Sequence, residues 1–325
     1  MILRIALGQR SWTICILLLL IYYIYRRGDS GYAVGEAFDK KSKESLSAKI
    51  EQPVRDFVNK SNLLPPLFRF REIFLISPKY NLATCQIEKV MSTFRSGMFC
   101  YLNRKRQFEK EGRNISTEHW SNTLCDDERD ERKTFDETIK SLRRNFLMFT
   151  VIREPLDRFL SGYTNKCVRE KRVPEEKCFG CRGSMMCFLK TLKEKLMAFH
   201  NNAQSVFGQD IYYMRHFAPT TWYCDLEKSF NLMHVIRYDM REREKLVSDF
   251  NSVLHRARVP FIQRNYISRE LLKKLPVHST SNSKERYEVE KELLSNPQLL
   301  MIIKFYSSLS MRVEVTQIRL PLRLL

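Results

Sequence analysis

The residues with the clearest chemical potential in this chain are Arg153, Arg158, Ser161 and Tyr163, which lie in the run FLMFTVIREPLDRFLSGYTNK at residues 146–166. Guanidinium groups donate several hydrogen bonds in a fixed fork that matches the oxygens of phosphate or sulfate. A serine hydroxyl can add a further donor. The run therefore predicts an anion-binding site.

Two elements must position these side chains. Residues 146–152 form a short apolar run rich in aromatic and β-branched types, which is typical of a strand covered on both faces. Arg153 then emerges where the strand ends, and Pro155 favours the first turn of a helix. Helix starts and the ends of parallel strands are common anion sites. The alternative is a solvated network in which Arg153 and Arg158 pair with neighbouring carboxylates.

The same run resembles the 3′-phosphate-binding segment of Golgi carbohydrate sulfotransferases: Arg-Asp/Glu-Pro, an acidic residue and Arg, then Ser-x-Tyr. The resemblance implies that Arg153 and Ser161 hold the 3′-phosphate of the sulfate donor, 3′-phosphoadenosine 5′-phosphosulfate (PAPS). Chondroitin and dermatan sulfotransferases look most similar, because they also continue with Asn-Lys after the tyrosine, as Asn165 and Lys166 do here.

Upstream residues suggest the other half of a donor site. Residues 71–77 are a plausible strand, residues 78–84 a loop, and residues 84–102 have helical apolar spacing with Thr84 as N-cap. The segment is similar to the family's 5′-phosphosulfate loop, Pro-Lys before a Thr or Ser that opens a helix. The resemblance places Lys79 as catalytic lysine at the leaving oxygen and Thr84 at the 5′-phosphate, although this loop is one residue longer than the family's.

A sugar hydroxyl needs a general base, and histidine or glutamate is the usual type. His119 lies between the two donor segments and is the first candidate, with Glu118 and His216 as alternatives. A lone histidine is more often structural than catalytic.

The resemblance extends over residues 68–313 through weaker segments at residues 214–224, 232–239, 278–280 and 297–313. It implies an α/β, P-loop-like sulfotransferase fold, with a central parallel sheet flanked by helices in a single catalytic domain with disulfide-stapled insertions. A Walker motif is absent, which argues against an ATPase or kinase.

Outside the N-terminal apolar segment the chain has an even set of cysteines that could form four disulfides in an oxidising compartment, with connectivity left open. They are Cys85, Cys100, Cys125, Cys167, Cys178, Cys181, Cys187 and Cys224. Zinc at Cys178 and Cys181 is the alternative, but no second Cys-x2-Cys pair accompanies them. We predict no metal.

The order of segments along the chain fits a type II membrane protein of the Golgi. We predict a cytoplasmic tail at residues 1–10, a signal-anchor transmembrane segment at 11–27, a stem at 28–66 and a luminal sulfotransferase domain at 67–325. A signal peptide cleaved near residues 33–35 is the alternative.

A formal net charge of +19 favours polyanionic partners, and no nucleic-acid-binding motif accompanies it. We expect an acidic glycosaminoglycan acceptor, the membrane through the anchor, no nucleic acid, and a homodimer as an option. The leading hypothesis is a chondroitin-type sulfotransferase. The alternatives are an inactive glycan-binding relative and a membrane-tethered nucleotide or phosphate-binding module without transfer activity.

Overall fold

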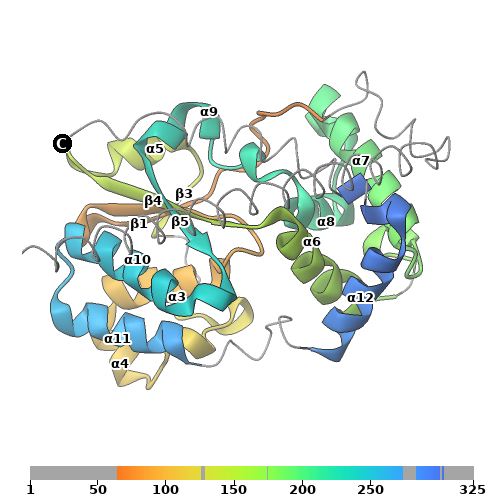
Figure 1. The fold of residues 1–325 in the computed structure, drawn as a ribbon. Coiled ribbons are helices and arrows are strands. Elements are labelled where there is room, and N and C mark those ends of the chain that lie inside the picture. The colour runs from red at the N-terminus through yellow and green to blue at the C-terminus, as the bar shows by residue number, and fades with distance from the viewer. Residues whose placement is uncertain (1–63, 126–128, 174, 274–282, 301, 304–325) are drawn as a thin grey trace, which may run out of the picture. The chain divides into compact units, whose positions relative to one another are not determined.

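The computed structural model describes residues 64–125, 129–173, 175–273, 283–300 and 302–303 (Figure 1), all within the compact unit that begins at Phe57. The predicted tail, anchor, most of the stem and the loop at 278–280 lie outside these residues. Of the predicted terminal helix, residues 297–300 and 302–303 are described, and they are helical. Within the described ranges no helix is both long and apolar enough to cross a bilayer.

The centre of the unit is a five-stranded mixed sheet of order β3-β1-β2-β4-β5. Its strands are β1 (Phe74–Ser77), β2 (Leu82–Cys85), β3 (Glu131–Arg132), β4 (Leu147–Arg153) and β5 (Met233–Tyr238). β2, β4 and β5 are parallel, whereas β1 pairs antiparallel with β2 and with β3. The α/β fold class is confirmed, and the strand predicted at 146–152 is β4 to within one residue.

Helices surround this sheet. They are α3 (Ser92–Asn103), α4 (Lys105–Lys110), α5 (Phe135–Lys140), α6 (Pro155–Tyr163), α7 (Met185–Asn201), α8 (Gln209–Phe217), α9 (Leu226–Ser229), α10 (Arg243–Arg256), α11 (Phe261–Leu272) and α12 (Lys284–Ser295). Figure 1 shows α3, α4, α10 and α11 on one side of the sheet and α5 and α9 on the other. The remaining helices, α6, α7, α8 and α12, are grouped beyond the end of β4.

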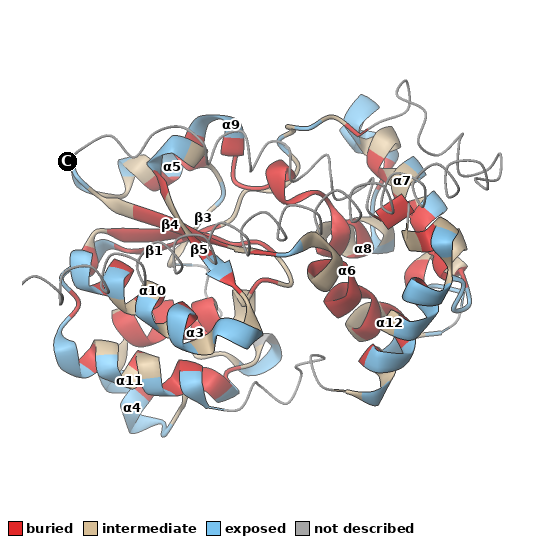
Figure 2. Ribbon diagram, in the orientation of Figure 1, coloured by how far each residue is buried: buried red, intermediate tan, exposed pale blue. Residues whose placement is uncertain are grey.

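The core on the α3 side is built around Phe149 of β4. Its ring stacks on Phe99 of α3 with centroids 6.2 Å apart and meets Phe250 of α10 edge-on at 5.9 Å. All three side chains are buried, and Figure 2 shows the middle of the sheet buried while the outer faces of α10 and α11 are exposed. Removing this much aromatic surface from water stabilises the packing that fixes the end of β4.

The local structure predicted for residues 78–102 is wrong in part. Residues 78–80 form a 3₁₀ turn, Asn81 takes a left-handed conformation with φ 50°, and β2 then returns antiparallel to β1. Thr84 is a fully buried strand residue, not a helix N-cap. Helix α3 begins only at Ser92. The apolar residues at 87, 90 and 91 that suggested a helix belong to a loop, where Ile87 and Val90 are buried.

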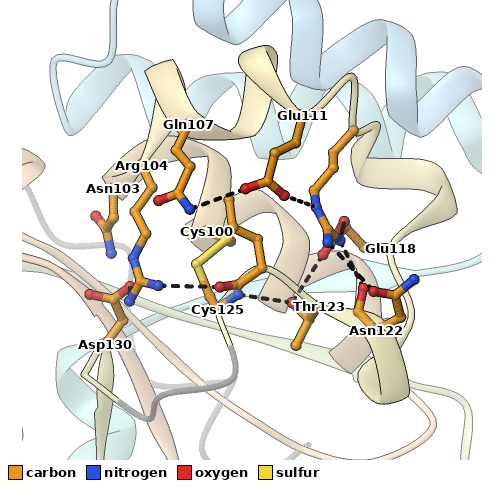
Figure 3. The surroundings of a disulfide bond; sticks show 12 residues. Cys100, Asn103, Arg104, Gln107, Glu111, Glu118, Asn122, Thr123, Cys125 and Asp130 are labelled. Atoms are coloured by element: carbon orange, nitrogen blue, oxygen red, sulfur yellow. Dashed lines mark hydrogen bonds and ion pairs between the residues drawn. A yellow bond between two sulfur atoms is a disulfide. The ribbon is translucent and has the colours of Figure 1, made fainter.

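All eight cysteines of the described unit form disulfides, as predicted. The pairs are Cys85–Cys224, Cys100–Cys125, Cys167–Cys178 and Cys181–Cys187. Because Cys178 and Cys181 belong to different disulfides, the zinc alternative is wrong. Figure 3 shows Cys100–Cys125 beside the pair of Arg104 and Asp130, whose Nη2 and Oδ2 atoms are 3.4 Å apart. The disulfide joins α3 to the segment that precedes β3, and the ion pair joins the residue after α3 to the same segment.

We expect the double variant Cys100→Ser, Cys125→Ser to lose about 3 kcal/mol of unfolding free energy, because the disulfide closes a loop with a sequence separation of 25. Urea unfolding followed by circular dichroism measures the change. A loss below about 1 kcal/mol would show that this crosslink does not limit the unfolded chain.

Candidate active site

The loop of residues 86–91 connects β2 to α3 and carries Lys89. Because β2 and β4 are adjacent and parallel, the end of β2 and Arg153 at the end of β4 point to the same edge of the sheet. Arg153 Nη1 donates a hydrogen bond of 3.1 Å to the carbonyl oxygen of Lys89. The predicted phosphate-binding arginine and a lysine that the sequence analysis did not single out therefore belong to one site.

Arg95 of α3 holds this loop from inside the protein. Its side chain is fully buried and donates to the carbonyl oxygens of Cys85 and Ile87 and to the hydroxyl of Thr84. Burial lowers the pKa of Arg95 to about 9. Thr84 thus bonds to an interior arginine, and its side chain is closed off from any ligand.

Two further carbonyl oxygens of the loop are held by arginines of the β4–α6 region. Arg158 Nε donates to the carbonyl oxygen of Glu88 at 3.0 Å, next to the bond from Arg153 to Lys89. The N–H of a trans peptide points away from its carbonyl oxygen. The amide hydrogens of Lys89 and Val90 therefore face the side opposite these guanidinium groups. Such aligned amides form anion-binding concavities.

Lys89 itself is half-buried among positive charges. Its Nζ donates to Asn165 Oδ1 at 2.6 Å. Loss of contact with water, followed by the charges of Lys166 and Arg153, lowers the pKa of Lys89 to about 7. A partly desolvated lysine among like charges is unfavourable unless an anion compensates it. The first turn of α3 begins three residues later and adds N–H groups without intrahelical partners.

The start of α6 is organised around Arg153. Glu154 caps the helix by accepting from Asp157 N at 2.6 Å, and Asp157 Oδ2 lies 2.5 Å from Arg153 Nε. The pairing of Arg153 with Asp157 is the one that the alternative expected, but Arg153 and Arg158 are 8% and 6% exposed, so they do not form a solvated surface network. Ser161 follows Asp157 by four residues and so lies on the same face of α6.

Asp157 also joins α6 to α12. Its Oδ1 lies 2.5 Å from Nη2 of Arg286, which is buried. Burial alone would raise the pKa of Asp157, but Arg153 and Arg286 hold it below its ordinary value. Arg286 therefore fixes the carboxylate that orients Arg153.

Helix α6 continues into a π-helical segment, Thr164–Arg169, which places Asn165 and Lys166 beside Lys89. π-Helical turns are rare and occur frequently at functional sites. Asn165 and Lys166 continue the motif that suggested the family, and the structure brings them to the site.

His216 of α8 lies in the same region. Its Nδ1 is 2.6 Å from the carbonyl oxygen of Tyr212, which can only accept, so Nδ1 carries the proton and Nε2 has the lone pair. Burial and the charges of Lys89 and Lys166 lower the pKa of His216 well below its ordinary range. Helices α8 and α6 pack so closely that a Cβ on Gly162 would lie 2.7 Å from Phe217 Cε1.

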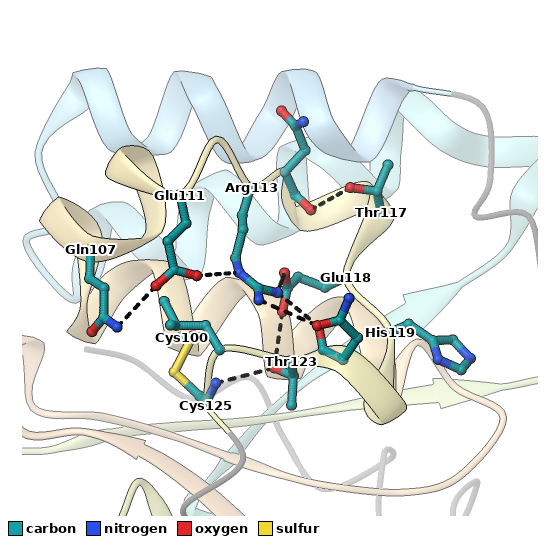
Figure 4. A network of polar contacts seen from close by, with 12 residues as sticks. Cys100, Gln107, Glu111, Arg113, Thr117, Glu118, His119, Thr123 and Cys125 are labelled. Carbon is teal, nitrogen blue, oxygen red and sulfur yellow. Dashed lines mark hydrogen bonds and ion pairs between the residues drawn. A yellow bond between two sulfur atoms is a disulfide. The ribbon is translucent and has the colours of Figure 1, made fainter.

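Glu118 and His119 are less suited to act as a base. Both carboxylate oxygens of buried Glu118 are engaged, at 2.9 Å each, by Arg113 Nη1 and the hydroxyl of Thr123. Figure 4 shows His119 pointing away from this network. Its Nδ1 accepts from Ser121 N at 3.3 Å and lies 2.6 Å from the Ser121 hydroxyl oxygen.

Lys79 lies at the other end of the sheet. It is exposed in the β1–β2 turn, with Nζ 5.0 Å from the centre of the Tyr80 ring. Leu82, just after this turn, pairs with Leu147 at the start of β4. β4 runs for about 20 Å before it reaches Arg153, so the structure does not bring Lys79 close to Arg153 and Lys89.

Comparison with known proteins decides the family. The family model described as "Sulfotransferase family" matches residues 72–308. The chain belongs to the sulfotransferase family. It is 29% identical to "Carbohydrate sulfotransferase chst-1" of Caenorhabditis elegans over 73% of each chain.

Two other relatives are from the same organism. "Uncharacterized protein C18B2.2" is 28% identical over 76% of this chain and 70% of its own, and "Putative sulfotransferase vep-2" is 29% identical over 66% and 67%. No solved structure matches the chain significantly. Among the described residues no group of three or more His, Cys, Asp or Glu could hold a metal ion.

The sequence of this sulfotransferase contains a pattern that points to Lys89 as a site residue. The pattern of a lysine followed shortly by Ser or Thr opening a helix fits Lys89 and Ser92. Glu88 stands where the pattern has proline, whereas Pro78-Lys79 supplies the dipeptide at a hairpin. The literal match therefore directed the prediction to the β1–β2 turn.

We expect binding of adenosine 3′,5′-bisphosphate to weaken as pH rises from 6 to 9. An anion binds better to charged Lys89, and the proton is lost near pH 7 in the free protein. Calorimetric titration across this range measures the effect. The variant Lys89→Met should bind more weakly and lose most of the pH dependence, and an unchanged slope in this variant would contradict the assignment.

Arg286→Met should weaken binding of adenosine 3′,5′-bisphosphate about tenfold and leave adenosine 5′-monophosphate unaffected, because Arg286 acts through Asp157 on Arg153. Lys284→Met on the same helix is the control, with its side chain 87% exposed. Equal weakening of both nucleotides would assign Arg286 to folding alone.

Proposed function

We propose that this sulfotransferase moves a sulfuryl group from PAPS to a hydroxyl of a glycosaminoglycan sugar, with chondroitin as the acceptor. The observation that carries the proposal is the bond from Arg153 to the backbone of Lys89, which joins two anion-binding elements at one edge of the sheet. Family membership supports the transfer reaction, and the sequence pattern of the β4–α6 region supports the donor.

In this proposal the two ends of the donor occupy separate elements. Arg153 and Ser161 hold the 3′-phosphate, as the sequence motif implies. Lys89, the amides of its loop and the first turn of α3 hold the 5′-phosphosulfate. Lys89 and Ser92 thereby take the places that the sequence analysis gave to Lys79 and Thr84.

The reaction is an in-line displacement at sulfur. The acceptor oxygen forms a bond to sulfur while the bond from sulfur to the bridging phosphate oxygen breaks, leaving adenosine 3′,5′-bisphosphate. Lys89 stabilises negative charge on the bridging oxygen, and His216 Nε2 accepts the proton of the acceptor hydroxyl. The negative charge of the bound donor opposes the cationic neighbours that lower the pKa of His216, and so makes it a better base.

Two features support an acidic glycan as acceptor. The chain carries a formal net charge of +19, and one relative is named as a carbohydrate sulfotransferase. We also propose that the segment at residues 11–27 anchors the chain in the Golgi membrane, with residues 67–325 in the lumen. The four disulfides are consistent with that oxidising compartment.

The test is incorporation of labelled sulfate from PAPS into desulfated chondroitin, with dermatan and heparan as parallel acceptors. Lys89→Ala and Arg153→Ala should each lower kcat/KM at least about 100-fold, since each removes a charged partner of the donor. Lys79→Ala should keep wild-type activity.

The opposite pattern, in which Lys79→Ala loses transfer activity and Lys89→Ala keeps it, would overturn the assignment of Lys89 to the active site. Donor binding by the wild type without transfer to any of the glycans would favour an inactive binding relative.

A further inference from the structure

Tyr212 of α8 is surrounded by three cationic side chains. Lys166 Nζ lies 4.7 Å from the ring centre, and the Cζ atoms of Arg172 and Arg215 lie 4.8 and 5.1 Å from it. Lys166 also donates to the phenol oxygen. We name Lys166, Arg172, Tyr212 and Arg215 the Tyr212 cluster. Such stacking holds guanidinium groups in place and leaves their edges able to donate hydrogen bonds.

Glu170 is the carboxylate partner of this cluster. It accepts from the Tyr212 hydroxyl at 2.7 Å, and its oxygens lie 3.3 Å from Arg172 Nε and 3.6 Å from Lys166 Nζ. One negative charge thus faces three positive ones in a partly buried environment. A structural ion network of ordinary type would be closer to balance, so the excess favours an anionic ligand.

The cluster extends outward from the donor site. Lys89 contacts Asn165, which is adjacent to Lys166, and His216 donates from Nδ1 to the backbone of Tyr212. Exposure of the side chain rises from 12% for Lys166 to 26% for Arg172. A bound sugar whose hydroxyl reaches His216 would therefore place a neighbouring group near Arg172 and Arg215.

Two disulfides crosslink the chain close to these cations. Cys167–Cys178 begins directly after Lys166, and Cys181–Cys187 ties the following turn to the start of α7. Arg172 lies between the first two cysteines, in the loop that their disulfide closes. A closed loop has less conformational freedom than an open one, so its donors bind a ligand at lower entropic cost.

We propose that Arg172 and Arg215 of the Tyr212 cluster bind the carboxylate of an acidic sugar in the acceptor, next to the hydroxyl that receives sulfate. This inference rests on the proposed function and deepens it by assigning the acceptor subsite. A guanidinium group matches a carboxylate with two parallel hydrogen bonds, which gives both orientation and affinity. The subsite would hold the acceptor in register with Lys89 and His216.

The experiment measures binding of three chondroitin hexasaccharides to the full chain saturated with adenosine 3′,5′-bisphosphate: unsulfated, carboxyl-reduced, and sulfated but carboxyl-reduced. Wild type should bind the unsulfated form at least tenfold more tightly than the carboxyl-reduced form. Arg172→Gln and Arg215→Gln should each abolish most of that preference, without changing the Kd of adenosine 3′,5′-bisphosphate. Arg182→Gln is the control, with its side chain 74% exposed in the same cysteine-rich segment.

Three outcomes overturn the subsite. Equal affinity of wild type for the first two hexasaccharides excludes a carboxylate ligand, and restoration of tight binding by sulfate assigns the cluster to a sulfate ester. Weaker nucleotide binding in the arginine variants assigns the cluster to the donor. Arginine-dependent carboxylate binding without any sulfate transfer would uphold the subsite and refute the proposed reaction, so the two failures are distinguishable.

Discussion

The hydrogen bond from Arg153 to the carbonyl oxygen of Lys89 is the contact on which the site depends. It joins the loop that follows β2 to the end of the neighbouring parallel strand, β4. In this way it connects the β2–α3 loop to the start of α6. Arg95 and Arg158 hold neighbouring carbonyl oxygens of the same loop. With these oxygens held by guanidinium groups, the amides of the loop face the other way, so an anion meets donors that need no rearrangement.

Positive charge is concentrated at this edge at an energetic cost. Burial and like charges depress the pKa of Lys89 and of His216, which shows that both charged forms are disfavoured in the free protein. In the proposed reaction, a polyanionic donor reverses this imbalance. The same electrostatics therefore make the site selective for anions and prepare a neutral histidine with its lone pair on Nε2.

The sequence predicted the strand and helix of the β4–α6 region well, because a strand covered on both faces and a proline-started helix leave strong local signals. The local structure of residues 78–102 was predicted less well. Pro78-Lys79 matched a familiar dipeptide, but the left-handed Asn81 turns the chain into a hairpin whose pairing is set by contacts distant in sequence. The carbonyl oxygen of Tyr212 that fixes the tautomer of His216 is likewise a matter of backbone geometry that composition and spacing do not report.

The most direct test of the central claim is a crystal structure of the protein with adenosine 3′,5′-bisphosphate bound. The account predicts the 3′-phosphate against Arg153 and Ser161, and the 5′-phosphate against Lys89 and the first turn of α3. A nucleotide bound at the β1–β2 turn beside Lys79, or with either phosphate away from the loop of residues 86–91 and the start of α6, would contradict it.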